Sequence, residues 1–171
     1  MKTLDWITAI VCASALMLFM TATEARAEVV AELSAQRIVA DAMGKETRSE
    51  VRAAKPGEVL EYRVAYRNPG KEPARQVQAL LPIPAGAFTY VAASARPEKV
   101  FASIDGKQFD AVPLMRAVTL PDGRRELRPV PLAEYRYLRW DLGDMPPGAQ
   151  AVVSARMRMT GVEQQGVGGA K

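Results

Sequence analysis

The stretch "EYRVAYRNPG", from Glu61 to Gly70, predicts a β-strand that runs into a tight turn. Large apolar side chains at Tyr62, Val64 and Tyr66 alternate with polar or small residues. Alternation with a period of two is typical of a strand that buries one of its faces. Proline cannot donate to a sheet ladder, and Asn and Gly favour turns, so the strand is expected to end at Asn-Pro-Gly.

The same period recurs along most of the chain, with turn signals about every ten residues. Asp105-Gly106 is a two-residue hairpin signal, and Pro121-Asp122-Gly123 marks a turn between short segments that can pair. Many short strands at this spacing predict an all-β fold, an immunoglobulin-like antiparallel β-sandwich of about seven to nine strands. The strands are expected at residues 29–40, 47–52, 59–67, 75–81, from 88 onward, 100–104, 134–143 and 149–159.

The predicted core contains three large aromatic residues, Tyr62, Tyr66 and Trp140, because each lies in period with aliphatic neighbours. In the segment "EYRYLRWDLG", from 134 to 143, the alternation places Tyr135 on the outward side. The last strand is expected to bury its alternate apolar residues, which are Ala151, Val153, Ala155, Met157 and Met159.

Residues 1–27 have the pattern of a secretory signal peptide. Lys2 precedes an apolar run from 6 to 20, and Ala25-Arg26-Ala27 is a typical cleavage site. We therefore expect export, with a mature chain that starts at Glu28 and lies in the periplasm or outside the cell. An uncleaved anchor is the alternative. The apolar run is shorter than the roughly 20 residues of a spanning helix, so we expect no membrane span after cleavage.

The mature chain is long enough for one domain and too short for two comfortable ones. We expect the precursor to carry a signal-peptide helix, followed by a single β-sandwich domain over residues 28–160. The tail at 161–171, "GVEQQGVGGAK", is rich in Gly and Gln and is expected to be disordered.

The composition excludes several classes of chemistry. The chain has no histidine, which removes histidine-based nucleophilic catalysis and the usual zinc and copper ligand sets. The single cysteine, Cys12, lies in the signal segment, so the mature chain has no disulfide. We expect no enzyme activity, no catalytic residue, and no cofactor or metal.

Two carboxylate pairs are the nearest candidates for polar chemistry: Asp105 with Asp110, and Asp141 with Asp144. We interpret Asp105 as a turn residue because it adjoins a glycine, and the second pair as residues that flank a bend. A weak calcium site at the second pair is the alternative, although the spacing lacks the alternating acidic pattern of a calcium loop.

Arginines are the most distinctive feature of the outward positions. If some of their strands are neighbours, they form an arginine-rich sheet face. Such a face is either a solvated surface paired with Glu61 and Asp141, or a docking face for an acidic partner or an anionic glycan. The five residues of this possible interaction face are Arg63, Arg67, Arg139, Arg156 and Arg158.

The net charge of the chain is +4. This charge either keeps the protein soluble or attracts anionic envelope polymers, and no nucleic-acid partner is expected for an exported protein.

The order of these motifs resembles the bacterial conserved-repeat domain, a family catalogued as a domain of unknown function and numbered eleven. The resemblance spans about residues 49–159 and implies a β-sandwich of surface or exported proteins. The stretch from 99 to 131 is longer than a minimal repeat and looks inserted, and only one copy is present. The motifs that carry the resemblance are Pro56-Gly57, Tyr62 to Gly70, Val77 to Gly86, Tyr90 to Ser94, Trp140 to Gly143, Pro147-Gly148 and Ala151 to Met159.

These observations predict an exported module of a bacterial envelope, structural or protein-binding and without catalytic activity. An alternative is a periplasmic accessory or chaperone-like subunit that pairs a sheet edge with a partner. A more distant alternative is a carboxylate-based enzyme that acts on envelope polymers. The expected partner is an envelope protein or an anionic envelope polymer.

Overall fold

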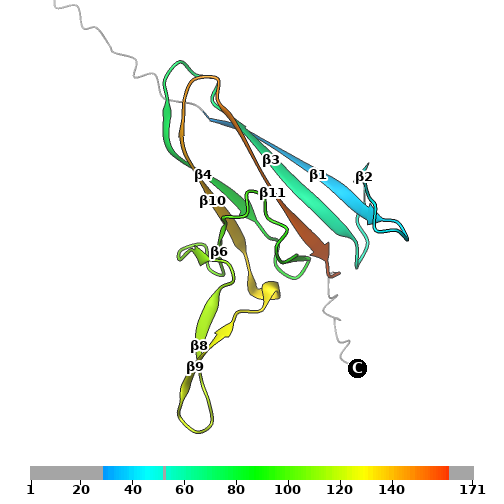
Figure 1. Cartoon of the computed structure of the whole chain (residues 1–171), viewed down its shortest axis with the longest axis vertical. Helices are drawn as coiled ribbons and strands as arrows, with labels where there is room; N and C mark the ends of the chain where they lie inside the picture. Colours follow the sequence, from blue (N-terminus) through cyan, green and yellow to red (C-terminus); the bar gives the residue numbers. More distant parts are fainter. Residues whose placement is uncertain (1–28, 52, 162–171) are drawn as a thin grey trace, which may run out of the picture.

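The computed structural model describes residues 29–51 and 53–161 (Figure 1). The expected signal peptide, the expected new amino terminus at Glu28 and the tail beyond Gly161 lie outside these residues. The elements, in chain order, are β1 (Val30–Ala40), β2 (Glu46–Glu50), β3 (Val59–Arg67), β4 (Ala74–Pro82), β5 (Phe88–Tyr90), β6 (Phe101–Ser103), β7 (Asp110–Ala111), β8 (Met115–Thr119), β9 (Arg125–Pro129), the short 3-10 helix η1 (Leu132–Glu134), β10 (Tyr137–Met145) and β11 (Gln150–Met159).

Two antiparallel sheets face each other and enclose the core (Figure 1). The larger sheet has the strand order β2-β1-β3-β11-β5, and the smaller one has the order β4-β10-β6-β7. The predicted all-β antiparallel sandwich is therefore confirmed. The described residues form eleven strands. That number exceeds the expected one because β7, β8 and β9 lie in the stretch that the resemblance marks as an insertion.

The inner faces follow the predicted alternation. Tyr66 and Trp140 are buried, while Tyr62 is half-buried against the core. On β11, the predicted inward residues Val153, Ala155 and Met157 are fully buried, and Ser154 and Arg156 between them are more exposed. Ala151 and Met159, at the two ends of the same side, are only partly buried. Full burial of one Val or Met side chain stabilises a fold by roughly 1.5–3 kcal/mol, so the inward side chains of β11 contribute much of the stability of the core.

Tyr135, predicted to face outward, is fully buried. It follows η1 and precedes β10, so the alternation of the strand does not extend to it. Its hydroxyl accepts a hydrogen bond from the backbone N–H of Leu114 at 2.8 Å. Its ring stacks on that of Tyr90, with the ring centroids 6.1 Å apart. Tyr135 thus connects the segments on either side of β8 and β9 to the core.

The Asp105-Gly106 connection is longer than the predicted two-residue turn, because residues 104–109 separate β6 from β7. The carboxylate of Asp105 accepts hydrogen bonds from the backbone N–H groups of Lys107 and Gln108, at 2.8 and 3.0 Å. These bonds extend the turn by two residues, as an aspartate side chain commonly does. The sequence signal therefore located the turn correctly but not its length.

Strands β8 and β9 form a hairpin that projects from one end of the sandwich (Figure 1), which we call the hairpin arm, residues 115–129. The predicted turn at Pro121-Asp122-Gly123 closes it, and the flanking segments pair as expected. No helix among the described residues is long and apolar enough to cross a membrane.

Candidate functional site

The structure brings together four of the five predicted site arginines. Arg63 and Arg67 belong to β3, and Arg156 and Arg158 belong to the adjacent strand β11. All four lie on the outer face of the larger sheet, because the alternate residues of both strands form the core. Arg139 lies on β10 in the other sheet. The five arginines therefore do not form a single face.

Arg156 belongs to a closed network of charges on this outer face. Its guanidinium donates two hydrogen bonds of 2.7 Å to the carboxylate of Glu46 on β2. It also lies 3.4 Å from Glu61, which accepts a 3.0 Å hydrogen bond from Arg48. The hydrogen bond from Arg48 lowers the pKa of Glu61, and the hydrogen bonds from Arg156 lower the pKa of Glu46. The charges around Arg156 on this face are therefore neutralised by partners within the protein.

Arg158 and Arg139 also have partners within the fold. Arg158 donates a 3.0 Å hydrogen bond to the carbonyl of Gly57, in the turn that precedes β3. The guanidinium of Arg139 lies over two rings, 4.6 Å from the centroid of Phe109 and 5.3 Å from that of Phe101. Its Nε lies 3.5 Å from Asp141, one of the acidic neighbours that the sequence suggested. These contacts stabilise the fold and occupy both side chains.

Arg63 and Arg67 remain open. Both are exposed, and neither has an ion-pair partner among the described residues. In the register, Arg63 lies between Ser34 of β1 and Ser154 of β11, so its directly opposite neighbours are small. Glu32 of β1, opposite Ala65, lies on the same face at a diagonal position to both arginines and, within the described residues, makes no ion pair with them. Four residues along one strand span about 13 Å, which sets the separation of these two cations. We call this part of the surface the open arginine pair.

Asp105 and Asp144, two of the four carboxylates that the sequence singled out, bond backbone N–H groups of a turn and of a bulge, whereas Asp141 contacts the side chains of Gln78 and Arg139. Besides the turn bonds described above, Asp105 accepts a hydrogen bond from the Ser103 hydroxyl. Asp144 accepts a bond from the Gln76 backbone N–H at 2.9 Å and a second from Arg75 at 2.6 Å. The first of these bonds is the main cause of the lowered pKa of Asp144. Within 29–51 and 53–161, no three acidic, histidine or cysteine side chains gather in a way that could hold a metal ion.

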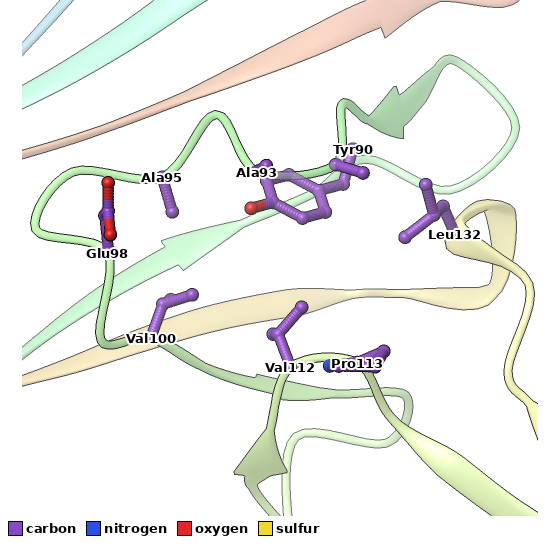
Figure 2. A pocket seen from close by; sticks show the side chains of 9 residues that line it. Tyr90, Ala93, Ala95, Glu98, Val100, Val112, Pro113 and Leu132 are labelled. Carbon is purple, nitrogen blue, oxygen red and sulfur yellow. The ribbon is translucent and has the colours of Figure 1, made fainter.

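An apolar pocket of about 490 Å³ opens at the edge of the sandwich. It lies between the segment that follows β5 and the segment that joins β7 to the hairpin arm. Figure 2 shows Ala95 and Tyr90 facing Val100 and Val112 across the hollow. The remaining lining residues are Ala92, Ala93, Glu98, Pro113 and Leu132. Such a lining can receive a small apolar group, and its one carboxylate, Glu98, is mostly exposed.

Sequence reasoning missed this pocket because its lining comes from segments without a regular period. Tyr90 is buried at the pocket wall, and burial raises the pKa of its hydroxyl. The signals that were available were the three alanines of "VAASA", which leave space beside larger neighbours. The sequence could not show which segments lie opposite these alanines, because that depends on how the two sheets pack.

No protein-family model, no curated protein and no solved structure matches this chain. The resemblance to the conserved-repeat family accordingly stays a prediction.

Proposed function

We propose that this protein is an exported, non-catalytic module of a bacterial envelope, built on an immunoglobulin-like β-sandwich, that binds an acidic partner. The observation that carries the proposal is the open arginine pair, Arg63 and Arg67. Their guanidinium groups are exposed on a sheet face where the neighbouring cation Arg156 is already neutralised by Glu46 and Glu61.

Arginine suits such a role because its planar fork donates two parallel hydrogen bonds to one carboxylate or phosphate. The residues that flank Arg63 across the sheet, Ser34 and Ser154, are small, so a partner can approach the guanidinium without a steric barrier. A partner with anionic groups spaced by about 13 Å would engage both cations at once. An acidic envelope protein and an anionic envelope polymer both provide such groups.

The contacts of the other polar side chains support a binding role over a catalytic one. The carboxylates with lowered pKa values, such as Asp105 and Asp144, are ionised and engaged by backbone N–H groups of turns. A general acid or base works best with a pKa near the operating pH, which is the opposite tendency. The distant alternative, a carboxylate-based enzyme, therefore has the least support.

The test compares two double variants for binding to soluble polyglutamate and to a soluble polyuronate. In Arg63→Gln/Arg67→Gln the open pair is removed. In Lys99→Gln/Lys107→Gln the same charge is removed from two exposed residues that flank β6, a strand of the smaller sheet. We expect the arginine variant to bind about tenfold more weakly, since two charge pairs worth about 0.7 kcal/mol each correspond to that factor. The lysine variant should change little.

Binding should also weaken as salt increases, because exposed charges are screened beyond about 8 Å at physiological ionic strength. Equal losses in the two double variants would indicate diffuse attraction by net charge and would contradict the proposal. The two probes separate the partner types, since a polypeptide and a sugar chain present carboxylates at different spacings.

A second candidate function, pairing of a sheet edge with a partner, is favoured by the hairpin arm. The long edge strand β4 pairs irregularly with β10, with register shifts between Asp141 and Gly143 and between Gly143 and Met145, and such bulges protect an edge from further pairing. Among the described residues, the strands of the hairpin arm pair only with each other, so each of them leaves one edge free in that part of the chain. An exposed strand edge is a template for another strand.

A further inference from the structure

The hairpin arm is fixed at its base and solvated along its length. Leu114 and Val130, which flank the two strands, are buried, and Arg116 makes hydrogen bonds of 2.7 and 3.0 Å to Glu134 of η1. Beyond the base, every residue of β9 is exposed, and the side chain of Leu127 is the most exposed large apolar one on the arm, at 66 %. A two-stranded hairpin is marginally stable alone in water, so an arm of this kind gains from a partner.

The hydrogen bonds of the arm determine which backbone groups of β9 are free. The N–H of Val130 donates to the carbonyl of Leu114, and the N–H of Leu120 donates to the carbonyl of Arg124, both at 2.8 Å. Bonded pairs alternate along an antiparallel ladder, so the even-numbered residues of β9 face β8. The backbone groups of Arg125, Leu127 and Pro129 therefore point outward at the free edge.

A second copy of β9 can meet this edge in an antiparallel arrangement with twofold symmetry. With the axis at Leu127, the two Leu127 residues exchange both backbone hydrogen bonds and place their apolar side chains together. Glu126 then lies opposite Arg128 of the second copy, and this favourable pair occurs twice. At each end of the contact, the N–H of Arg125 donates to the carbonyl of Pro129 in the second copy. The return bond is absent because proline has no N–H.

Other axes fit less well. An axis at Arg125 would place two arginines opposite each other, and an axis at Pro129 has no N–H to donate. On the other edge of the arm, pairing of two β8 strands about Ala117 would place Arg116 opposite Val118, with no complementary charge. The β9 edge with its axis at Leu127 is thus the arrangement that the sequence of the arm favours.

We propose that two copies of this protein associate by antiparallel pairing of β9 about Leu127, which joins their hairpin arms into one four-stranded sheet. This proposal rests on the second candidate function, edge pairing, and names a second copy as the partner. The contact involves five residues of each chain, so the association is weak and depends on concentration.

Sedimentation velocity of the mature protein over a range of concentrations tests the proposal. The wild-type protein should form a dimer reversibly. The variants Glu126→Arg and Arg128→Glu each place like charges opposite each other twice, and we expect each to dimerise about tenfold more weakly. An equimolar mixture of the two variants should recover association, because every pair in the mixed dimer is again oppositely charged. Lys71→Glu, with the same charge change as Arg128→Glu but outside the arm, should behave like the wild type.

The arm is exposed, so these variants should keep their fold, which circular dichroism checks. A wild-type protein that stays monomeric at the highest concentration overturns the proposal. A dimer that both single variants leave intact, or a mixture that fails to recover, overturns it as well. Polyglutamate and polyuronate binding, measured on the same samples, reports separately on the open arginine pair, so failure of dimerisation and failure of acidic-partner binding are distinguishable.

Discussion

The side-chain amide of Asn68 donates a 2.8 Å hydrogen bond to the backbone carbonyl of Met145, 77 residues further along the chain. The same amide donates a second 2.8 Å bond to the carbonyl of Glu72, and its oxygen accepts the N–H of Gly70 at 3.0 Å. Asn68 is fully buried. Asn68, the residue that follows β3, therefore connects the β3–β4 turn to the end of β10 in the opposite sheet.

Asn68→Ala is expected to destabilise the protein by about 3 kcal/mol, because it removes three hydrogen bonds worth about 1 kcal/mol each and leaves the buried carbonyl of Met145 without this partner. Urea unfolding measures the loss. The neighbouring exposed Pro69→Ala serves as the control and should change stability by less than about 1 kcal/mol. A similar small effect for both variants would show that Asn68 acts only as a turn residue.

Trp140→Ala should cost about 3–5 kcal/mol, the usual loss for a large buried aromatic side chain. Trp140 is 1 % exposed, and its indole N–H donates a 2.9 Å hydrogen bond to the carbonyl of Pro97. Trp140→Phe keeps most of the ring and should cost less. Leu80→Ala, at an outward and half-exposed position of the neighbouring strand, is the surface control. A loss below about 1 kcal/mol for Trp140→Ala would contradict the described core.

Stability should depend on pH only at the acidic end of the usual range. Hydrogen bonds from Arg48 lower the pKa of Glu61 below its ordinary 4.5, and the N–H of Gln76 lowers that of Asp144. A lowered folded pKa contributes stability above the unfolded value, and this stability is lost as pH falls through the folded value.

Because the chain has no histidine, the urea midpoint should stay nearly constant from about pH 5 to 8 and then drop below about pH 4.5. Glu61→Gln should make the acidic drop less steep, since it removes one of the titrating groups. A large change of the midpoint between pH 6 and 7 would be inconsistent with this account.

The exported protein is expected to begin at Glu28. Intact-mass spectrometry of protein recovered from the medium or periplasm of an expressing bacterium measures the amino terminus. Ala27→Arg should block cleavage, because the signal peptidase site requires a small residue there. Recovery of the wild-type chain with residues 1–27 still attached would exclude the predicted processing.

Local periodicity located most of the strands. β3 runs over Val59–Arg67, as predicted, because alternation of apolar and polar residues is a property of the strand itself and needs no knowledge of its neighbours. The same reasoning placed the buried side of β11 and the turn of the hairpin arm. It was wrong at Tyr135, which lies outside the strand, where no period applies and burial depends on the segments packed around it.

By itself, the sequence determined which side of each strand is apolar and where the chain turns, since both depend on residues close together in the chain. Only the tertiary structure decided which strands are neighbours. The pairing of β3 with β11 made Arg63 and Arg67 share a face with Arg156, and placed Arg139 on the other sheet. Likewise Asn68 was recognisable as a turn residue, but its bond to Met145 requires the two sheets to pack. Strand order and sheet packing are set by contacts between distant residues, which no short window of sequence contains.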